Sequence, residues 1–354
     1  MYTRNVLETP KKLVQNGKIN FGTFLSAPEK IDIKDVPAPY AGIPFPKFVS
    51  NTRIKSRLSF VFDNDEYIGM CEFFDDKVFG LAEVIFWEKK TGKKMAYHNF
   101  MGPRRRFVPK NTRKAACVSF DKTRYMKISW NRELNKIFLS FTVKGDKFRP
   151  AAKGRFEAVF DEYTKEMVAV TPAPSTQRCS ATWIMAMPSK GGISVAKHRR
   201  FIKQLPVENS RSMFLLNRTY VKSHSLREVM FGFVNLDGKN ISFSFASSNQ
   251  DASNPDHFND NVLVIDKELT PMPPVCITHP FGVSKKWVIQ DTESMVDLAF
   301  YPASVNNRVL NIIVMRNAYS TIYGTFEGVL FSKDGEKIVL KNCPGIVKKS
   351  TLRL

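Results

Sequence analysis

The densest group of chemically active side chains in this sequence is a run of cations in its first half. Six Lys and Arg side chains fall close together, interleaved with Phe107 and Pro109. Guanidinium groups bind carboxylates and phosphates through paired hydrogen bonds, so this run predicts a loop that docks onto an anion. A solvated basic loop or a nuclear-import-like cluster is the alternative. The six residues are Arg104, Arg105, Arg106, Lys110, Arg113 and Lys114.

Further cations follow on the strands expected directly after this loop. Strand alternation would place some of Lys122, Arg124 and Lys127 on one face of a sheet. With Tyr125 and Trp130 nearby, such a face could stack nucleic-acid bases, although exposed lysines on the outside of a barrel would give the same pattern. No pattern of a dedicated nucleic-acid-binding module occurs, so RNA is the second choice of partner.

Catalytic chemistry has weaker support in the sequence. None of the histidines has metal-ligand spacing, and only His257 has close carboxylates, in a polar stretch that is more simply a surface loop. No glycine-rich phosphate loop and no Gly-x-Ser-x-Gly motif occur. The five cysteines lie far apart without a C-x-x-C pair, which predicts free thiols. The sequence therefore predicts no catalytic residue, no metal and no cofactor.

Short alternating runs must position these side chains. Residues 136–143 alternate between polar and apolar, and Asp237-Gly238 and Asp334-Gly335 each stand between two strand-like runs, as in a hairpin turn. No long segment carries an apolar helical stripe, so at most short helices are expected, within 206–217 or around 256–262. The sequence predicts an all-β fold of two tandem antiparallel barrels.

The 354 residues divide into three expected parts. Residues 1–50 are punctuated by proline and predict an extended arm. A turn-like stretch near residue 190 predicts the boundary between a basic first barrel, 51–195, and a second barrel, 196–354. Each half holds roughly eight strand-like runs, the number that closes a small barrel. No apolar run is long enough to span a bilayer and no secretory signal is seen, so a cytoplasmic location is expected.

Charge is the least ordinary property of the chain. Lys and Arg number 54 against 33 Asp and Glu, a net charge of +21. Residues 101–150 hold 14 of these cations against 3 anions, whereas residues 251–300 hold 3 against 8. Net charge indicates partners rather than fold, and this excess predicts an acidic partner. A membrane surface is a further alternative, although no amphipathic helix supports it.

The C-terminal residues resemble the closing hairpin of a known family. Tyr323-Gly324-Thr325-Phe326-Glu327-Gly328, followed by Asp334-Gly335 and Gly345-Ile346, are similar to the domain of unknown function 2804 family. Short stretches at 16–22, 168–172 and 261–263 also agree. The resemblance implies tandem lipocalin-like β-barrels, related to carotenoid hydratases and to lipid-handling proteins.

One motif departs from the family pattern. Family members carry Asp-Trp-x-Arg-Gly just after the midpoint, and the matching stretch here runs from Glu208 to Ser212 with only Arg211 unchanged. The resemblance therefore implies that a pocket built on this motif has degenerated in this chain, and that the chain is not an enzyme.

Charge and motifs together favour a non-enzymatic structural scaffold. Its basic face would dock onto an acidic protein assembly, a cytoskeletal polymer such as the microtubule being preferred. The alternative, which follows from the resemblance, is a lipocalin-like carrier or hydratase for a lipid or isoprenoid ligand. The barrel interior separates the two hypotheses, because a carrier needs a continuous apolar cavity whereas scaffold barrels would be filled by Phe and Met.

Overall fold

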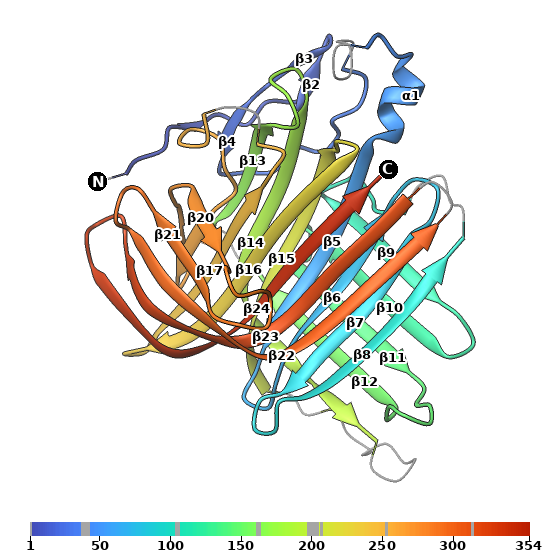
Figure 1. Ribbon diagram of the computed structural model, residues 1–354, viewed down its shortest axis with the longest axis vertical. Coiled ribbons are helices and arrows are strands. Elements are labelled where there is room, and N and C mark those ends of the chain that lie inside the picture. The colour runs from blue at the N-terminus through green and yellow to red at the C-terminus, as the bar shows by residue number, and fades with distance from the viewer. Residues whose placement is uncertain are drawn as a thin grey trace.

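The computed structural model consists almost entirely of β-strands, so the predicted all-β class is confirmed. One sheet curls into a near-closed barrel and the other into a half-barrel, called here the first and second lobes (Figure 1). The structure describes residues 2–36, 43–102, 107–160, 164–196, 205, 208–251, 254–312 and 315–354.

The first lobe is a sheet whose strand order runs β8-β7-β6-β5-β15-β14-β12-β11-β10-β9. Alternation sets its two faces: in β11 the side chains of Ile137, Leu139, Phe141 and Val143 face the core, and Ser140 lies on the opposite face. The strands are β5 (Ile54–Asp63), β6 (Tyr67–Asp75), β7 (Gly80–Glu88), β8 (Lys93–Met101), β9 (Lys114–Phe120), β10 (Arg124–Asn131), β11 (Lys136–Val143), β12 (Ala152–Val159), β14 (Cys179–Val195) and β15 (Glu208–Tyr220).

The N-terminal segment lies against the first lobe. β4 (Gly22–Phe24) pairs with β13 (Glu166–Pro172), which in turn pairs with β14, and β1 (Val6–Leu7) runs parallel to β4. β2 (Val14–Gln15) and β3 (Lys18–Ile19) form a small hairpin. In the described part of the chain the single helix is α1 (Lys47–Thr52), and no described helix could cross a membrane.

The second lobe begins at β16, so the two sheets divide the chain between Tyr220 and His224, after the boundary expected at 195–196. Asp237 and Gly238 take positive φ angles of 51° and 81° and close the β16–β17 hairpin as the sequence predicts. The strands, in sheet order, are β19 (Glu268–Pro271), β18 (Val262–Ile265), β17 (Lys239–Ser248), β16 (His224–Leu236), β24 (Lys337–Arg353), β23 (Met315–Phe331), β22 (Val296–Ile312), β21 (Trp287–Asp291) and β20 (Val275–Thr278).

The weakly supported helices are corrected by this topology. Residues 208–217 belong to β15, which pairs with β5 and β14 and packs one face into the barrel core and the other into the layer between the lobes. Residues 255–257 form a turn rather than a helix. Neither place carries an apolar helical stripe, and residues 208–217 instead pair with distant strands.

Phenylalanine rings fill both lobes by lying over glycines of the neighbouring strand. Phe141 is the cross-strand partner of Gly154, and Phe243 is the partner of Gly232. A Cβ atom at Gly154 would come within 2.2 Å of the Phe141 ring, so only glycine leaves room for it. This packing accounts for part of the high phenylalanine content of the chain.

A separate apolar layer joins the two lobes. Outward-facing side chains of the first lobe, such as Val61 and Met213, are buried in one cluster with Phe233 and Ile346 of the second. The Trp87 ring stacks on Tyr323 with centroids 5.8 Å apart. In Figure 1 the long strands β22–β24 (orange to red) cross in front of β5–β8 (blue to cyan). The lobes therefore form one packed unit.

Candidate functional site

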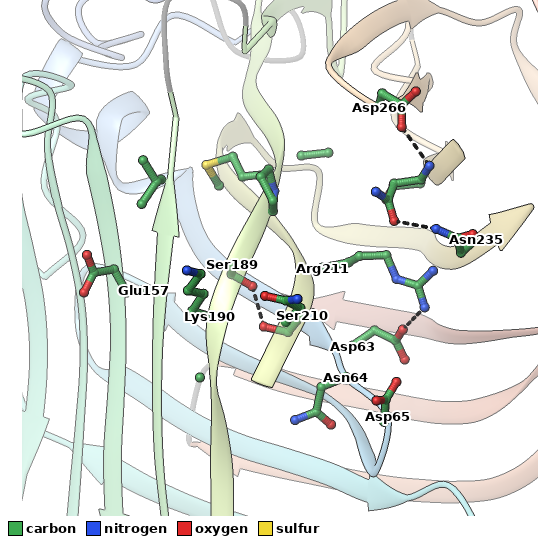
Figure 2. Close-up of a pocket in the computed structure, with 18 of the residues that line it drawn as sticks. Asp63, Asn64, Asp65, Glu157, Ser189, Lys190, Ser210, Arg211, Asn235 and Asp266 are labelled. Atoms are coloured by element: carbon green, nitrogen blue, oxygen red, sulfur yellow. Dashed lines mark hydrogen bonds and ion pairs between the residues drawn. The ribbon is translucent and has the colours of Figure 1, made fainter. Parts of the chain in front are cut away.

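A cleft of about 1120 Å³ opens where the two lobes meet (Figure 2). The first lobe contributes the turn after β5 and parts of β12, β14 and β15, and the second contributes residues of β16, β17 and the turn after β18. The volume is that of a site for a whole organic molecule rather than for a single ion. Side chains and backbone groups of both polar and apolar character line it.

A buried carboxylate fixes one wall of the cleft. Asp63 is fully buried and forms ion pairs with Arg211 of β15 and with Lys89, whose Nζ lies 2.8 Å away. Two cations around one buried carboxylate hold all three side chains in place. Beside them the Ser189 and Ser210 hydroxyls are 2.8 Å apart. This wall is therefore rigid before any ligand enters.

Two cations on the cleft wall stay available to a ligand. Arg155 and Lys190 are exposed and have no ion-pair partner in the described ranges, whereas the nearby Glu157 is paired with Lys136 at 2.5 Å. Guanidinium and ammonium groups at the rim of a cleft suit a ligand that ends in a carboxylate or another anionic group.

An acidic group with an altered pKa stands beside the cleft. Burial raises the pKa of the Glu208 carboxyl, and the negative charges of Glu66 and Asp65 raise it further. One Glu208 oxygen is buried without a hydrogen-bond partner. Two residues that line the cleft adjoin this carboxyl: Asn209 is the next residue in sequence, and Asp65 is one of the acids whose charge acts on it. A raised pKa lets a carboxyl keep a proton to a higher pH, which is the property required of a general acid.

The interior of the first lobe is filled rather than hollow. Its core contains ten or more aromatic rings, and among them Phe62 stacks on Phe156 with centroids 4.4 Å apart. A second void, between β8 and β10, holds only about 10 Å³. In the described part of the chain no cluster of His, Cys, Asp and Glu could hold a metal ion. The cleft is therefore the better candidate for a ligand site than the barrel.

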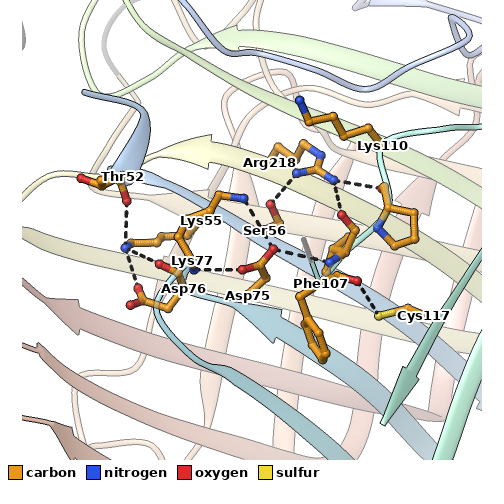
Figure 3. A network of polar contacts seen from close by, with 12 residues as sticks. Thr52, Lys55, Ser56, Asp75, Asp76, Lys77, Phe107, Lys110, Cys117 and Arg218 are labelled. Atoms are coloured by element: carbon orange, nitrogen blue, oxygen red, sulfur yellow. Dashed lines mark hydrogen bonds and ion pairs between the residues drawn. The ribbon is translucent and has the colours of Figure 1, made fainter. Parts of the chain in front are cut away.

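The structure places two of the predicted docking cations against the N-terminal segment. Lys110 pairs with Asp32, and Arg113 pairs with Glu29 at 2.7 Å. Figure 3 shows Lys110 beside a network in which the buried Arg218 donates to Ser56 and to the carbonyls of Val108 and Pro109. These cations fasten the arm and the loop before β9 to the end of the barrel.

The other predicted cations do not lie beside Lys110 and Arg113 at the N-terminal segment. Lys114 and Lys122 are exposed at opposite ends of the β9 region, and Lys127 points outward from the middle of β10. Arg124 donates to the carbonyl of His98 at the seam between β8 and β10. Arg104, Arg105 and Arg106 lie outside the described residues. The described cations thus occupy several separate places.

Most of the cleft has no signal in the sequence. Asp63 and Arg211 are 148 residues apart, and Lys190 and Asp266 belong to different lobes. Only the family motif pointed there, since Asn209, Ser210 and Arg211 all line the cleft. The stretch that departs from the family pattern therefore still builds a cavity wall.

Family membership follows from a match along almost the whole chain. The model of the family described as Domain of unknown function (DUF2804) matches residues 4–354. The chain belongs to this family. No curated protein is similar enough to the chain to count as a match.

Solved structures share the fold at very low sequence identity. A protein assigned as AttH from Nitrosomonas europaea is 10% identical, with a TM-score of 0.51 over 88% of this chain and 98% of that chain. CghA, crystallised with Sch210972, is 10% identical with a TM-score of 0.50 over 94% and 98%. Kievitone hydratase from Nectria haematococca is 11% identical with a TM-score of 0.42 over 93% and 98%. At such identities the likeness establishes the lipocalin-like fold alone.

These likenesses correct the expectation of a non-enzymatic cytoskeletal scaffold. The fold is shared with CghA, a protein crystallised with the small molecule Sch210972, and this finding contradicts the expected scaffold role. The expectation that the chain is not an enzyme is wrong for the same reason. The net positive charge overstated the case for docking, because two of the cations counted toward it, Lys110 and Arg113, are paired with acids of the same chain.

Proposed function

We propose that the protein binds a small lipid-like or isoprenoid-like molecule in the cleft between its lobes and acts on it as a hydratase-type enzyme. The observation that carries this proposal is the cleft itself, about 1120 Å³ in volume and lined from both lobes. The fold it shares with a small-molecule complex of CghA supports the proposal. Arg155 and Lys190 would receive the anionic or polar end of the ligand, and the remaining walls its apolar body.

Hydration of a carbon–carbon double bond needs one acid and one water molecule. Glu208 would give its proton to one carbon while the water oxygen bonds to the other, and the proton released from that water would restore the carboxyl group. The raised pKa of Glu208 suits it for the first step, since the carboxyl keeps its proton to a higher pH than an ordinary glutamate does. The family motif places an Asp where this chain has Glu208, so the acidic function of the position is kept.

Binding of a fluorescent fatty acid to a variant with a filled cleft tests the proposal. Asn209 is exposed and lines the cleft, so Asn209→Trp fills part of the volume without disturbing the core. The affinity for cis-parinaric acid should fall at least about tenfold, because the indole occupies ligand volume. The matched control is Gln177→Trp, at an exposed position that does not line the cleft.

The affinities of the two variants for cis-parinaric acid distinguish the cleft from any other ligand site. Weaker binding by Asn209→Trp alone supports the cleft as the ligand site. Equal binding by both variants places the ligand elsewhere and overturns the proposal. A wild-type protein that binds neither cis-parinaric acid nor any isoprenoid alcohol that competes with it overturns the ligand class as well.

A further inference from the structure

Two loops at one end of the first lobe hold phenylalanine rings in solvent. Phe120, at the β9–β10 turn, is 67% exposed, and Phe148, in the β11–β12 loop, is 87% exposed. The Lys144 backbone N–H donates to the carbonyl of Thr123 at 2.8 Å, which places the two loops side by side. We call Phe120, Phe148, Lys122, Lys144 and Lys147 the aromatic tip.

Both loops are shaped by their own carboxylates. Asp121 accepts the backbone N–H groups of Thr123 and Arg124 at 2.6 and 2.8 Å. Asp146 accepts those of Phe148 and Arg149, both at 2.9 Å. Hydrogen bonds of this kind fix a turn and direct the negative charge into it. Asp146 also forms an ion pair with Arg149, and no ion pair joins Asp121 or Asp146 to a lysine of the aromatic tip in the described residues.

The β11–β12 loop is also anchored to the barrel wall. Arg149 donates from NH1 to the carbonyl of Ala96 at 2.8 Å, and its guanidinium lies 5.5 Å from the centre of the Tyr97 ring. An anchored loop that leaves a phenylalanine ring uncovered is unusual, since a large apolar side chain is stabilised by burial. The neighbouring Lys147 ammonium is 6.0 Å from the Phe148 ring centre, so charge and apolar surface are presented together.

The three lysines of the aromatic tip have no ion-pair partner among the residues described, and all three are exposed. Aromatic rings at the end of a protein, surrounded by uncompensated lysines, match the chemistry of an anionic bilayer surface. There the rings enter the boundary between head groups and acyl chains, and the ammonium groups meet the negative head groups.

The basic surface continues from the aromatic tip toward the cleft. On the outer face of the sheet Lys127 pairs with Ser140, and Ser140 pairs with Arg155, which lines the cleft. At the opposite end of the same strands Leu134, in the β10–β11 turn, is 61% exposed, but the nearby cations Arg132 and Lys136 are ion-paired with Glu166 and Glu157. Exposed phenylalanine rings and lysines without an ion-pair partner therefore occur together only at the aromatic tip among the described ends of these strands.

We propose that the aromatic tip docks the protein onto an anionic membrane surface by inserting Phe120 and Phe148 beside three lysines. This surface lies outside the cleft, so docking does not depend on the function proposed for the cleft. A protein that collected an apolar ligand from a bilayer would use both the aromatic tip and the cleft, with Lys127 and Arg155 on the surface between them.

Co-sedimentation of the full-length protein with vesicles tests the docking. Vesicles of phosphatidylcholine with about 30% phosphatidylserine should bind the protein, and vesicles of phosphatidylcholine alone should bind it at least about tenfold more weakly. Removing charge in Lys122→Gln/Lys147→Gln should weaken binding about fivefold for each lysine. Phe120→Ser/Phe148→Ser should weaken it at least about tenfold, because two rings lose their apolar burial.

Matched controls use the same kinds of residue elsewhere. Leu134→Ser removes an apolar side chain of similar exposure from the other end of the strands, and Lys341→Gln removes an exposed lysine of β24. Both should bind as the wild type does. All four positions substituted in the tip are on the surface, so each variant should unfold at the wild-type temperature.

A second measurement reports insertion directly. The four native tryptophans are buried, so Phe148→Trp adds the one indole whose emission should shift to shorter wavelength on phosphatidylserine vesicles. Absence of vesicle binding, equal loss in Leu134→Ser, or an unshifted Phe148→Trp spectrum on bound protein would each overturn the proposal. So would binding of RNA in solution with no binding of vesicles. Failure here leaves the cleft test unaffected, since cis-parinaric acid binding needs no vesicle.

Discussion

The contact between the lobes contains a buried charged group whose removal makes a sharp prediction. Lys348 of β24 is 4% exposed, and its Nζ lies 2.6 Å from Glu72 Oε1 and 3.8 Å from Glu83 Oε2. Its ammonium also lies 4.6 Å from the centre of the Tyr319 ring. The two glutamates come from β6 and β7 of the first lobe, so this lysine joins the lobes through charge as well as through packing.

The two carboxyls respond differently to this environment. Burial opposes the charge of Glu72, but Lys348 and Arg57 outweigh it and hold the pKa of Glu72 below its usual range. Burial raises the pKa of Glu83, Lys348 counteracts this, and the charge of Glu72 adds to it. Without the lysine both carboxyls would lose their main buried cation, and only Arg57 would remain beside Glu72.

Lys348→Met is expected to destabilise the protein by about 3 kcal/mol near neutral pH. Removing one partner of a buried ion pair costs about 3–5 kcal/mol because the other partner stays charged and desolvated. We expect a loss at the low end of this energy range, because Glu83 can take up a proton and so relieve part of the cost of an unpaired buried charge. Urea denaturation, followed by the fluorescence of the four buried tryptophans, measures the change.

The neighbouring lysine supplies the control. Lys349 pairs with Glu228 at 3.0 Å but is 24% exposed in its side chain, so Lys349→Met should cost less than about 1 kcal/mol. The loss in Lys348→Met should also shrink as the pH falls, because protonated glutamates need no cation. Equal stability of the two variants, or a loss that grows toward acid pH, would refute the reasoning.

Two further predictions concern the first lobe. Burial, with the charges of Arg308, Arg124 and Arg149, lowers the pKa of His98 to about 4, so the unfolded chain binds a proton between about pH 6.5 and 4 that the folded chain does not. Stability from this group is therefore present above pH 6.5 and lost as pH falls to 4. Because His98→Gln cannot take up this proton, the fall in the free energy of unfolding between pH 6.5 and 4 should be smaller in the variant by about 1–2 kcal/mol after allowance for solvent screening. An unchanged dependence of the unfolding free energy on pH would contradict the assignment. Gly154→Ala should lower the free energy of unfolding by about 1–3 kcal/mol in urea denaturation, because the new Cβ meets the Phe141 ring. The control is Gly102→Ala, whose Cβ meets nothing within 4 Å and which should leave the stability near that of the wild type. Equal effects of the two substitutions would rule out the packing argument.

Local patterns in the chain were sufficient to predict its strands. Residues 136–143 alternate because one face of β11 is buried, and Asp237-Gly238 closes a hairpin because both residues accept positive φ. These features depend on neighbouring residues only. The C-terminal motif likewise identified the family, since the residues that carry it are contiguous or nearly so.

The functional surfaces depended on contacts that no local pattern records. Lys110 reads as a docking cation in the sequence, yet the fold brings Asp32 against it from 78 residues away. Arg211 reads as the remnant of a lost motif, yet Asp63 and the second lobe make it part of a cleft. The alternation of a strand sets which side chains face outward, but only the packing of one sheet against another decides which of those are covered, paired or left free.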